Sequence, residues 1–141
     1  MKGRFKYEKL SKYPHLRPED IEIWERFIFK YPYFFESVDY DVRVGEGQKY
    51  SKSAPENIRE DLRGLTQKRI DVVGYVGNTT HIVEVKPRAA TTAIGQVLTY
   101  EELYKIDFPE ETNIIKTIIT DHEVPDIATI VEKYNINIFV V

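Results

Sequence analysis

The sequence of 141 residues contains no cysteine, and this absence excludes several kinds of chemistry. A disulfide framework, a thiolate zinc site, an iron–sulfur cluster and a cysteine nucleophile all require the missing thiol. No apolar run approaches the roughly 20 residues that cross a bilayer, and the N-terminus lacks the apolar segment of a signal peptide. We therefore expect an intracellular, cytoplasmic protein that has no membrane partner.

The chain also has little net charge, with a formal value of −3 at pH 7. Taken alone, this total does not indicate a nucleic-acid-binding protein. The distribution is uneven, because residues 1–100 have a net charge of +3 and residues 101–141 one of −6. The locally basic stretch 43–69 is compatible with a surface that holds a polyanion and equally with a solvated loop of mixed charge. Its basic residues are Arg43, Lys49, Lys52, Arg59, Arg63, Lys68 and Arg69.

What the chain does have is the composition of an ordinary globular domain, with 42% hydrophobic and 30% charged residues. A length of 141 residues is enough to bury a core without disulfides or structural metals. We therefore predict a single domain over residues 1–141. It would have an N-terminal extension over 1–17 and a polar, locally basic insertion over 45–69.

Hydrophobic periodicity predicts alternating helices and strands. A first helix is indicated by Pro18 followed by acidic residues, which favour the positive end of a helix. In the next segment, valine and tyrosine alternate with charged residues from Val38 to Val44, as in a strand with one buried face. A hairpin followed by a helix and a further strand predicts a mixed sheet covered by helices, of the α/β (α+β) class. The predicted helices are 18–30, a short one near 55–65, 91–105 and 125–134; the strands are 37–44, a hairpin over 70–86, 113–120 and 136–141.

Three charged residues lie in segments that otherwise have the character of buried strands. These are Asp71 and, thirteen residues later, Glu84 and Lys86. A charge among β-branched residues is costly to desolvate unless it is compensated. Alternation puts Glu84 and Lys86 on one face, and a turn at Gly77-Asn78 would bring Asp71 next to Glu84 in an antiparallel hairpin.

Two carboxylates with one lysine retain an excess of negative charge, which favours a bound cation. Mg²⁺ prefers oxygen ligands and can polarise a phosphoryl oxygen or lower the pKa of a coordinated water. Lys86, on the face of Glu84, could hold an attacking water or offset charge. The plainer alternative for these three residues is a salt bridge at the end of a strand.

This order of elements, with Asp71, the Glu84-Val85-Lys86 tripeptide and the helix that follows, resembles the PD-(D/E)XK nuclease superfamily, which has the restriction-endonuclease-like fold. The resemblance covers residues 18–141 and is most specific over 69–104. It implies the core order α-β-ββ-α-β-α-β. One departure is Ile70, where many members have proline before the aspartate.

The resemblance also implies roles for individual residues. Asp71 and Glu84 would bind magnesium, with the carbonyl of Val85 as a further ligand, and Mn²⁺ could replace the magnesium. Lys86 would position or activate water, and Gln96 on the following helix would brace the site.

On the helical wheel, Gln96 lies at the margin of the buried arc, a position that is also common for a glutamine without a role. Glu101 falls inside this arc, and we assign it no function. Some members of the superfamily place a further metal-binding glutamate on the first helix. Glu25 is the candidate here, and a surface carboxylate is the alternative.

The function that we expect is a magnesium-dependent nuclease, an endonuclease acting on DNA, of the small kind encoded by phages and mobile elements. RNA remains open as a substrate, and the last strand could pair across a homodimer. Two alternatives on the same fold are a non-catalytic nucleic-acid-binding module and a subunit of a larger nuclease complex. The residues expected to contact nucleic acid are Lys49, Lys52, Arg59, Arg63, Lys68 and Arg88.

Overall fold

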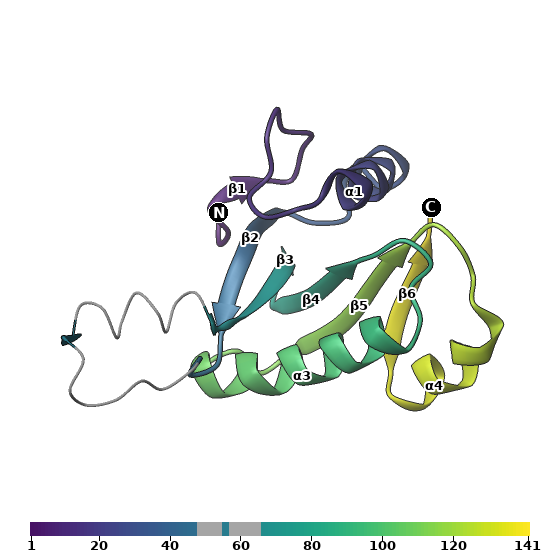
Figure 1. Cartoon of the computed structure of the whole chain (residues 1–141). Coiled ribbons are helices and arrows are strands. Elements are labelled where there is room, and N and C mark those ends of the chain that lie inside the picture. The colour runs from purple at the N-terminus through teal and green to yellow at the C-terminus, as the bar shows by residue number, and fades with distance from the viewer. Residues whose placement is uncertain (48–54, 57–65) are drawn as a thin grey trace.

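The computed structural model of the chain describes residues 1–47, 55–56 and 66–141. In these residues six strands form one mixed sheet, in the order β1-β2-β3-β4-β5-β6. Helix α1 covers one face of the sheet, and α3 and α4 cover the other (Figure 1). The strands are β1 (Phe5–Lys6), β2 (Ser37–Val44), β3 (Lys68–Val76), β4 (Thr79–Val85), β5 (Ile114–Thr120) and β6 (Ile136–Val140); the helices are α1 (Pro18–Lys30), α3 (Thr91–Asp107) and α4 (Ala128–Lys133), with a 3-10 turn η1 (Pro125–Ile127) before α4.

The mixed α/β class predicted from the sequence is confirmed. Each segment predicted within the described residues has a counterpart of the same type, and the ends differ by one or two residues. The helix expected near 55–65 falls almost wholly outside the described ranges. β1 was not predicted, because a two-residue strand is too short to show an alternating pattern. No helix of the described ranges is long and apolar enough to span a bilayer.

The first four strands are antiparallel neighbours, and β5 and β6 extend the sheet in parallel. The hairpin prediction is confirmed, because β3 and β4 are antiparallel and their register pairs Val76 with Thr79 around the turn. Gly77 occupies this turn with a φ of +54°, a left-handed conformation that glycine adopts without steric cost.

The two halves of β2 contribute side chains to different hydrophobic cores. Val38 and Tyr40 pack in the cluster beneath α1, whereas Val42 and Val44 pack in the cluster beneath α3. Simple alternation predicted one shared face for these four residues, and that prediction is wrong. The cause is Asp41, whose φ of +54° interrupts the extended backbone between the two halves.

β3 changes faces at the matching position. Ile70 contributes to the cluster beneath α3 and Val72 to the cluster beneath α1, so the interruption falls at Asp71. The register pairs Tyr40 with Val72 and passes over Asp41 and Asp71. The side chain of Asp71 therefore lies at a break in the sheet and outside its regular ladder.

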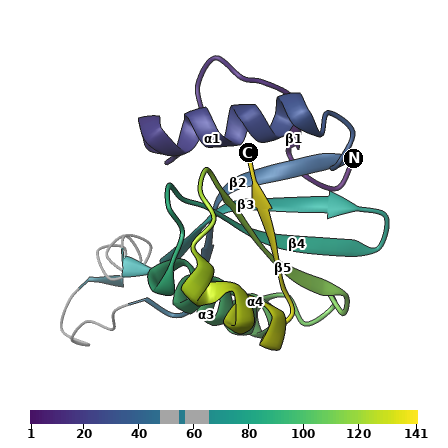
Figure 2. The same cartoon turned by 90° about the vertical axis from the view of Figure 1, so that its right-hand side faces the viewer.

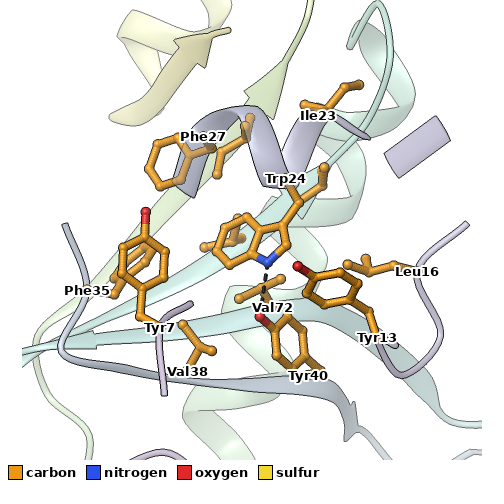
Figure 3. Close-up of a cluster of buried hydrophobic side chains, with 13 residues drawn as sticks. Tyr7, Tyr13, Leu16, Ile23, Trp24, Phe27, Phe35, Val38, Tyr40 and Val72 are labelled. Carbon is orange, nitrogen blue, oxygen red and sulfur yellow. Dashed lines mark hydrogen bonds between the residues drawn. The ribbon is translucent and has the colours of Figure 1, made fainter. Parts of the chain in front are cut away.

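The core beneath α1 is largely aromatic and includes the N-terminal extension. Figure 3 shows Tyr7 and Tyr13 of this extension beside Trp24 of α1. The indole Nε1 of Trp24 donates a hydrogen bond to the hydroxyl of Tyr40, with 3.0 Å between the heavy atoms. Because Tyr13 and Leu16 are buried, residues 1–17 are a folded part of the domain that fixes the approach to α1.

The opposite face is covered by α3, whose small residues allow close approach to the sheet. Ala93 and Val97 are fully buried with Ile118 of β5. One and two turns further along, Tyr100 and Tyr104 cover β3 and β4. The first half of α3 therefore packs against β5 and the second half against β3 and β4.

Candidate metal and substrate site

A cavity of about 380 Å³ lies where β3, β4, α3 and the start of α1 converge. The structure brings to it all the residues that the sequence suggested for the metal and catalytic centre except Glu25. They are Asp71, Glu84, Val85, Lys86 and Gln96. Residues up to 25 positions apart in sequence therefore share one site.

The hairpin register explains how the two carboxylates meet. Val72 pairs with Val83, so Asp71 lies across from Glu84 at the next position. The backbone N–H of Val85 donates to Oδ2 of Asp71 at 3.1 Å. In a strand the carbonyl of a residue points to the same side as its N–H, so the Val85 carbonyl is directed toward Asp71 as well.

The electrostatics of this pair indicate a missing positive charge. Glu84 is only 6% exposed, and burial together with the Asp71 charge raises the pKa of Glu84 to about 9. Burial likewise raises the pKa of Asp71 to about 6, against the lowering effect of the Val85 hydrogen bond. A cation between the two carboxylates would oppose both shifts, because it stabilises their ionised forms.

Two buried oxygen atoms at the site have no hydrogen-bond partner among the residues that the structure describes. They are Oε2 of Glu84 and Oε1 of Gln96. An unpaired buried acceptor costs roughly 1–3 kcal/mol, so such atoms are rare without a reason. The amide Nε2 of Gln96 faces the Tyr100 hydroxyl at 3.4 Å, which leaves Oε1 to accept from a water or to approach a cation.

Two further acidic residues, Glu19 and Asp20, line the cavity from the first turn of α1, and the sequence did not point to either of them as a site residue. Burial raises the pKa of Asp20, and its charge in turn raises the pKa values of Asp71 and Glu84. The acidic first turn was visible in the sequence, where its evident explanation was the helix dipole.

The structure does not bring Glu25 to this cavity. Its Oε2 accepts a hydrogen bond from the Tyr13 hydroxyl at 2.9 Å, and Oε1 lies 4.0 Å from Nζ of Lys9. Helix α1 begins at the cavity and runs away from it, so a residue one and a half turns past Asp20 cannot reach the two carboxylates. The prediction that Glu25 binds the metal is therefore corrected, and Glu19 and Asp20 are the acidic residues of α1 that line the cavity.

Within the described ranges, no three His, Cys, Asp or Glu side chains converge closely enough to hold a metal by themselves. The groups that could hold a metal are therefore Asp71, Glu84 and the Val85 carbonyl. This set fits Mg²⁺, which commonly uses one or two carboxylates and keeps several waters or substrate oxygens.

Lys86 lines the same cavity and acts on three of its carboxylates. Its positive charge lowers the pKa values of Asp20, Asp71 and Glu84. For Asp71 and Glu84 this effect is smaller than that of burial, so the lysine only partly offsets the negative charge of the pair.

A second cation, Arg69, is held away from the carboxylate pair. Its Nε and Nη2 each donate to a different oxygen of Asp41, both at 2.7 Å. Hydrogen bonds and charge from Arg69 lower the pKa of Asp41 despite its partial burial. The Arg69 guanidinium holds Asp41, opposite Asp71, in a left-handed conformation. Backbone strain of this kind costs roughly 1–3 kcal/mol, which these hydrogen bonds offset.

Basic side chains line the mouth of the cavity. His15 and Arg17 come from the N-terminal extension, and Lys68 comes from the start of β3. Lys68 was among the predicted nucleic-acid contacts, whereas His15 and Arg17 were not, because nothing in the sequence places residues 1–17 against the site. His15 also has a φ of +63°, another local strain at this cavity.

The remaining predicted contacts lie elsewhere or outside the described residues. Arg88 does not line the cavity; its N–H donates to Oδ1 of Asp121 at 2.8 Å, and its guanidinium lies 3.5 Å from the ring of His122. The other four predicted contacts lie outside the described ranges. They are Lys49, Lys52, Arg59 and Arg63.

Three comparisons with known proteins, against protein-family models, curated proteins and solved structures, found no match to this chain.

Proposed function

We propose that this chain is a magnesium-dependent nuclease of the PD-(D/E)XK type that hydrolyses phosphodiester bonds in DNA. The observation that carries the proposal is the pair formed by the partly buried Asp71 and the buried Glu84, beside Lys86 in one cavity. Within the described residues, one Glu84 oxygen has no hydrogen-bond partner. The proposal includes the restriction-endonuclease-like fold and an intracellular setting, such as that of a phage or mobile-element enzyme.

Each group has a defined task in this proposal. Asp71, Glu84 and the Val85 carbonyl hold the metal through oxygen atoms, and Asp20 adds negative charge from the helix side. A bound Mg²⁺ would polarise the phosphoryl oxygen and lower the pKa of a coordinated water. Lys86 orients the attacking water and offsets the charge that develops on the phosphate.

The basic residues at the mouth of the cavity complete the substrate path. His15, Arg17 and Lys68 lie where the phosphates next to the reacting one would approach. Contacts of this kind bind a polyanion without reading its sequence. Repulsion between the acidic centre and the phosphate backbone is thereby compensated along the approach.

The decisive experiment is a cleavage panel of linear, circular, single-stranded and branched DNA and matching RNA, each with Mg²⁺, Mn²⁺ or chelator. We expect cleavage of at least one DNA substrate with either metal and none with chelator. Asp71→Asn should abolish it while the circular dichroism spectrum stays unchanged. Cleavage that persists in chelator or in Asp71→Asn would contradict the proposal.

A second candidate is a non-catalytic nucleic-acid-binding module. It is favoured by the small donor set, since the described residues supply no third ligand side chain to the carboxylate pair. Such a protein would bind DNA, shown by fluorescence anisotropy, with no cleavage under any metal. The panel above separates the two candidates directly.

A further inference from the structure

The N-terminal extension, residues 1–17, is far more basic than the rest of the chain. It contains six Lys and Arg and a single Glu, a net charge of +5, whereas residues 18–141 have a net charge of −8. All six cationic residues are exposed, and a positive surface of this density on an acidic protein attracts polyanions locally. They are Lys2, Arg4, Lys6, Lys9, Lys12 and Arg17.

Buried side chains between these cations hold the extension on the domain. Tyr7, Tyr13 and Leu16 are at most 9% exposed and belong to the core beneath α1. The Tyr7 hydroxyl donates to the carbonyl of Tyr31 at 2.7 Å, and the Tyr13 hydroxyl donates to Glu25. In Figure 2 the extension, in purple, passes beside α1, and part of it reaches beyond the helix on the side away from the sheet. Its charges are therefore held in place before any ligand binds, which lowers the entropic cost of binding.

Two of these cations, Lys9 and Lys12, lack close counterions. Nζ of Lys9 lies 4.0 Å from Oε1 of Glu25, and the other oxygen of this carboxylate is already bonded to Tyr13. Among the described residues, no acidic side chain forms an ion pair with Lys12. An exposed pair at 4.0 Å contributes little to stability, so both ammonium groups are available to an external anion.

Lys9 and Lys12 lie close to the cavity of the candidate site. They line a second cavity of about 500 Å³ between the extension and α1, together with Ile21. Asp20, the residue before Ile21, lines the cavity of the candidate site, and so does His15. Lys12 and Lys9 precede His15 by three and six residues, which span at most roughly 10 and 20 Å of chain. At 3.4 Å per base pair these distances correspond to roughly three and six base pairs of a duplex.

The orientation of the aromatic residues indicates which polyanion fits this surface. Proteins that hold single strands stack the bases on exposed aromatic rings, and peripheral membrane segments insert exposed apolar side chains. Within residues 1–17 the rings of Tyr7 and Tyr13 are buried in the core, and Phe5 is partly buried. The extension therefore presents mainly charge to the solvent, which matches the outward-facing phosphates of a double strand.

We propose that Lys9 and Lys12 bind phosphates of a double-stranded substrate on one side of the bond that is cleaved. This inference rests on the proposed nuclease function and names the class of its substrate. His15 and Arg17 at the mouth of the cavity connect the reacting phosphate to these two lysines. Contacts to the backbone carry no sequence information, so the extension fixes the position of the duplex and does not select its sequence.

The test measures duplex DNA binding by fluorescence anisotropy in chelator, at several salt concentrations. Each phosphate contact contributes about 0.9 to the slope of log affinity against log salt, so Lys9→Gln with Lys12→Gln should reduce this slope by about 2. The matched control is Lys30→Gln with Lys133→Gln, at exposed positions in the last turns of α1 and α4. It removes the same charge and should leave the slope unchanged. Wild type should bind a duplex more tightly than a single strand of equal length.

Cleavage kinetics provide a second measurement. Contacts that are made equally in the ground state and the transition state affect KM and leave kcat unchanged, and we expect this result for Lys9→Gln with Lys12→Gln. Both lysines are exposed, so the thermal melt of this variant should match that of wild type. A variant that lowers kcat and keeps KM would contradict a role in holding the substrate.

Three binding results would also overturn this inference: no duplex binding by wild type, equal slopes in the double variant and its control, or equal affinity for single and double strands. Loss of binding to anionic lipid vesicles in the double variant, with DNA binding unchanged, would assign the extension to a membrane surface instead. A wild type that shows the expected slopes and cleaves nothing would contradict the nuclease proposal alone. Cleavage by wild type with an unchanged slope in the double variant would contradict this inference alone.

Discussion

Two glutamates of this protein are buried to nearly the same degree, and their surroundings are opposite. Glu84 is 6% and Glu101 8% exposed. Glu101 on α3 is compensated, because Lys116 and Lys105 both lie within 3.5 Å of its oxygens. Glu84 has an unpaired Oε2 and the acidic Asp71 as its neighbour. Burial of a carboxylate therefore does not by itself indicate function. The informative feature is whether nearby positive side chains compensate its charge.

The largest expected difference between the two glutamates is in cleavage. Glu84→Gln should reduce magnesium-dependent DNA cleavage by about 10³-fold or more, since a metal contributes several kcal/mol to charge stabilisation in the transition state. Glu101→Gln should stay within a few-fold of wild type in the same single-turnover assay. Equal losses in both variants would mean that Glu84 is structural like Glu101.

Lys86 tests the same difference between the two glutamates. Among the described residues two lysines line the cavity, Lys86 near Glu84 and Lys68 at the mouth. We expect Lys86→Ala to slow cleavage by about 10²–10⁴-fold, the usual contribution of a positioned proton-transfer group. Magnesium binding, followed by calorimetry, should persist in this variant. Cleavage at the wild-type rate would exclude the role that we propose for the lysine.

Magnesium should stabilise the fold only through the uncompensated site. At a concentration of 100 times its dissociation constant, the ion should raise the free energy of unfolding of wild type by about 2.7 kcal/mol. Glu101→Gln should show the same gain, and Glu84→Gln should show little or none. Thermal melts with and without magnesium measure this, and a similar gain in Glu84→Gln would place the ion elsewhere.

Without metal, the two substitutions should act on stability in opposite directions. Glu101→Gln leaves Lys116, whose side chain is 13% exposed, without its counterion and should destabilise the fold by roughly 1–3 kcal/mol. Glu84→Gln removes a carboxyl whose ionised form is disfavoured by burial and by Asp71, so it should stabilise the fold above the raised pKa of Glu84. Urea unfolding in chelator gives both values.

The last expected difference between the two glutamates is a pH dependence of the metal-free protein. The pKa of Glu84 is raised from 4.5 to about 9, so the folded state binds more protons than the unfolded state between these values. Stability from this group is therefore present below pH 4.5 and is lost as pH rises toward 9. Urea titrations should show this slope in wild type and Glu101→Gln and a weaker one in Glu84→Gln.

The sequence was sufficient for features that depend on neighbours along the chain. The register around Gly77-Asn78 and the period of two placed Asp71 beside Glu84, and the helical period placed Gln96 at the margin of α3. Each of these positions follows from one turn and one regular repeat. One of the two lysines that compensate Glu101 could be predicted from the sequence, since Lys105 lies four residues later on the same helix.

Features that depend on distant contacts could not be predicted in this way. Asp20 and Glu25 both lie on α1, and choosing between them requires knowing which end of the helix meets the sheet. The change of faces at Asp41 depends on a hydrogen-bonded Arg69 from another strand. A period of two cannot reveal a left-handed residue whose cause is a contact 28 positions away.

The break at Asp41 and Asp71 bears on what a protein engineer would have to transplant. Grafting Asp71, Glu84 and Lys86 onto an uninterrupted hairpin would place the aspartate in a regular ladder and commit its side chain to whichever face the alternation dictates. Here the aspartate lies where both strands exchange layers, and Arg69 with Asp41 maintains that exchange. The smallest unit that could be transplanted is therefore a set of five residues with the strands and connection that hold them: Asp41, Arg69, Asp71, Glu84 and Lys86. A graft of Asp71, Glu84 and Lys86 alone should yield a stable sheet with no cation affinity.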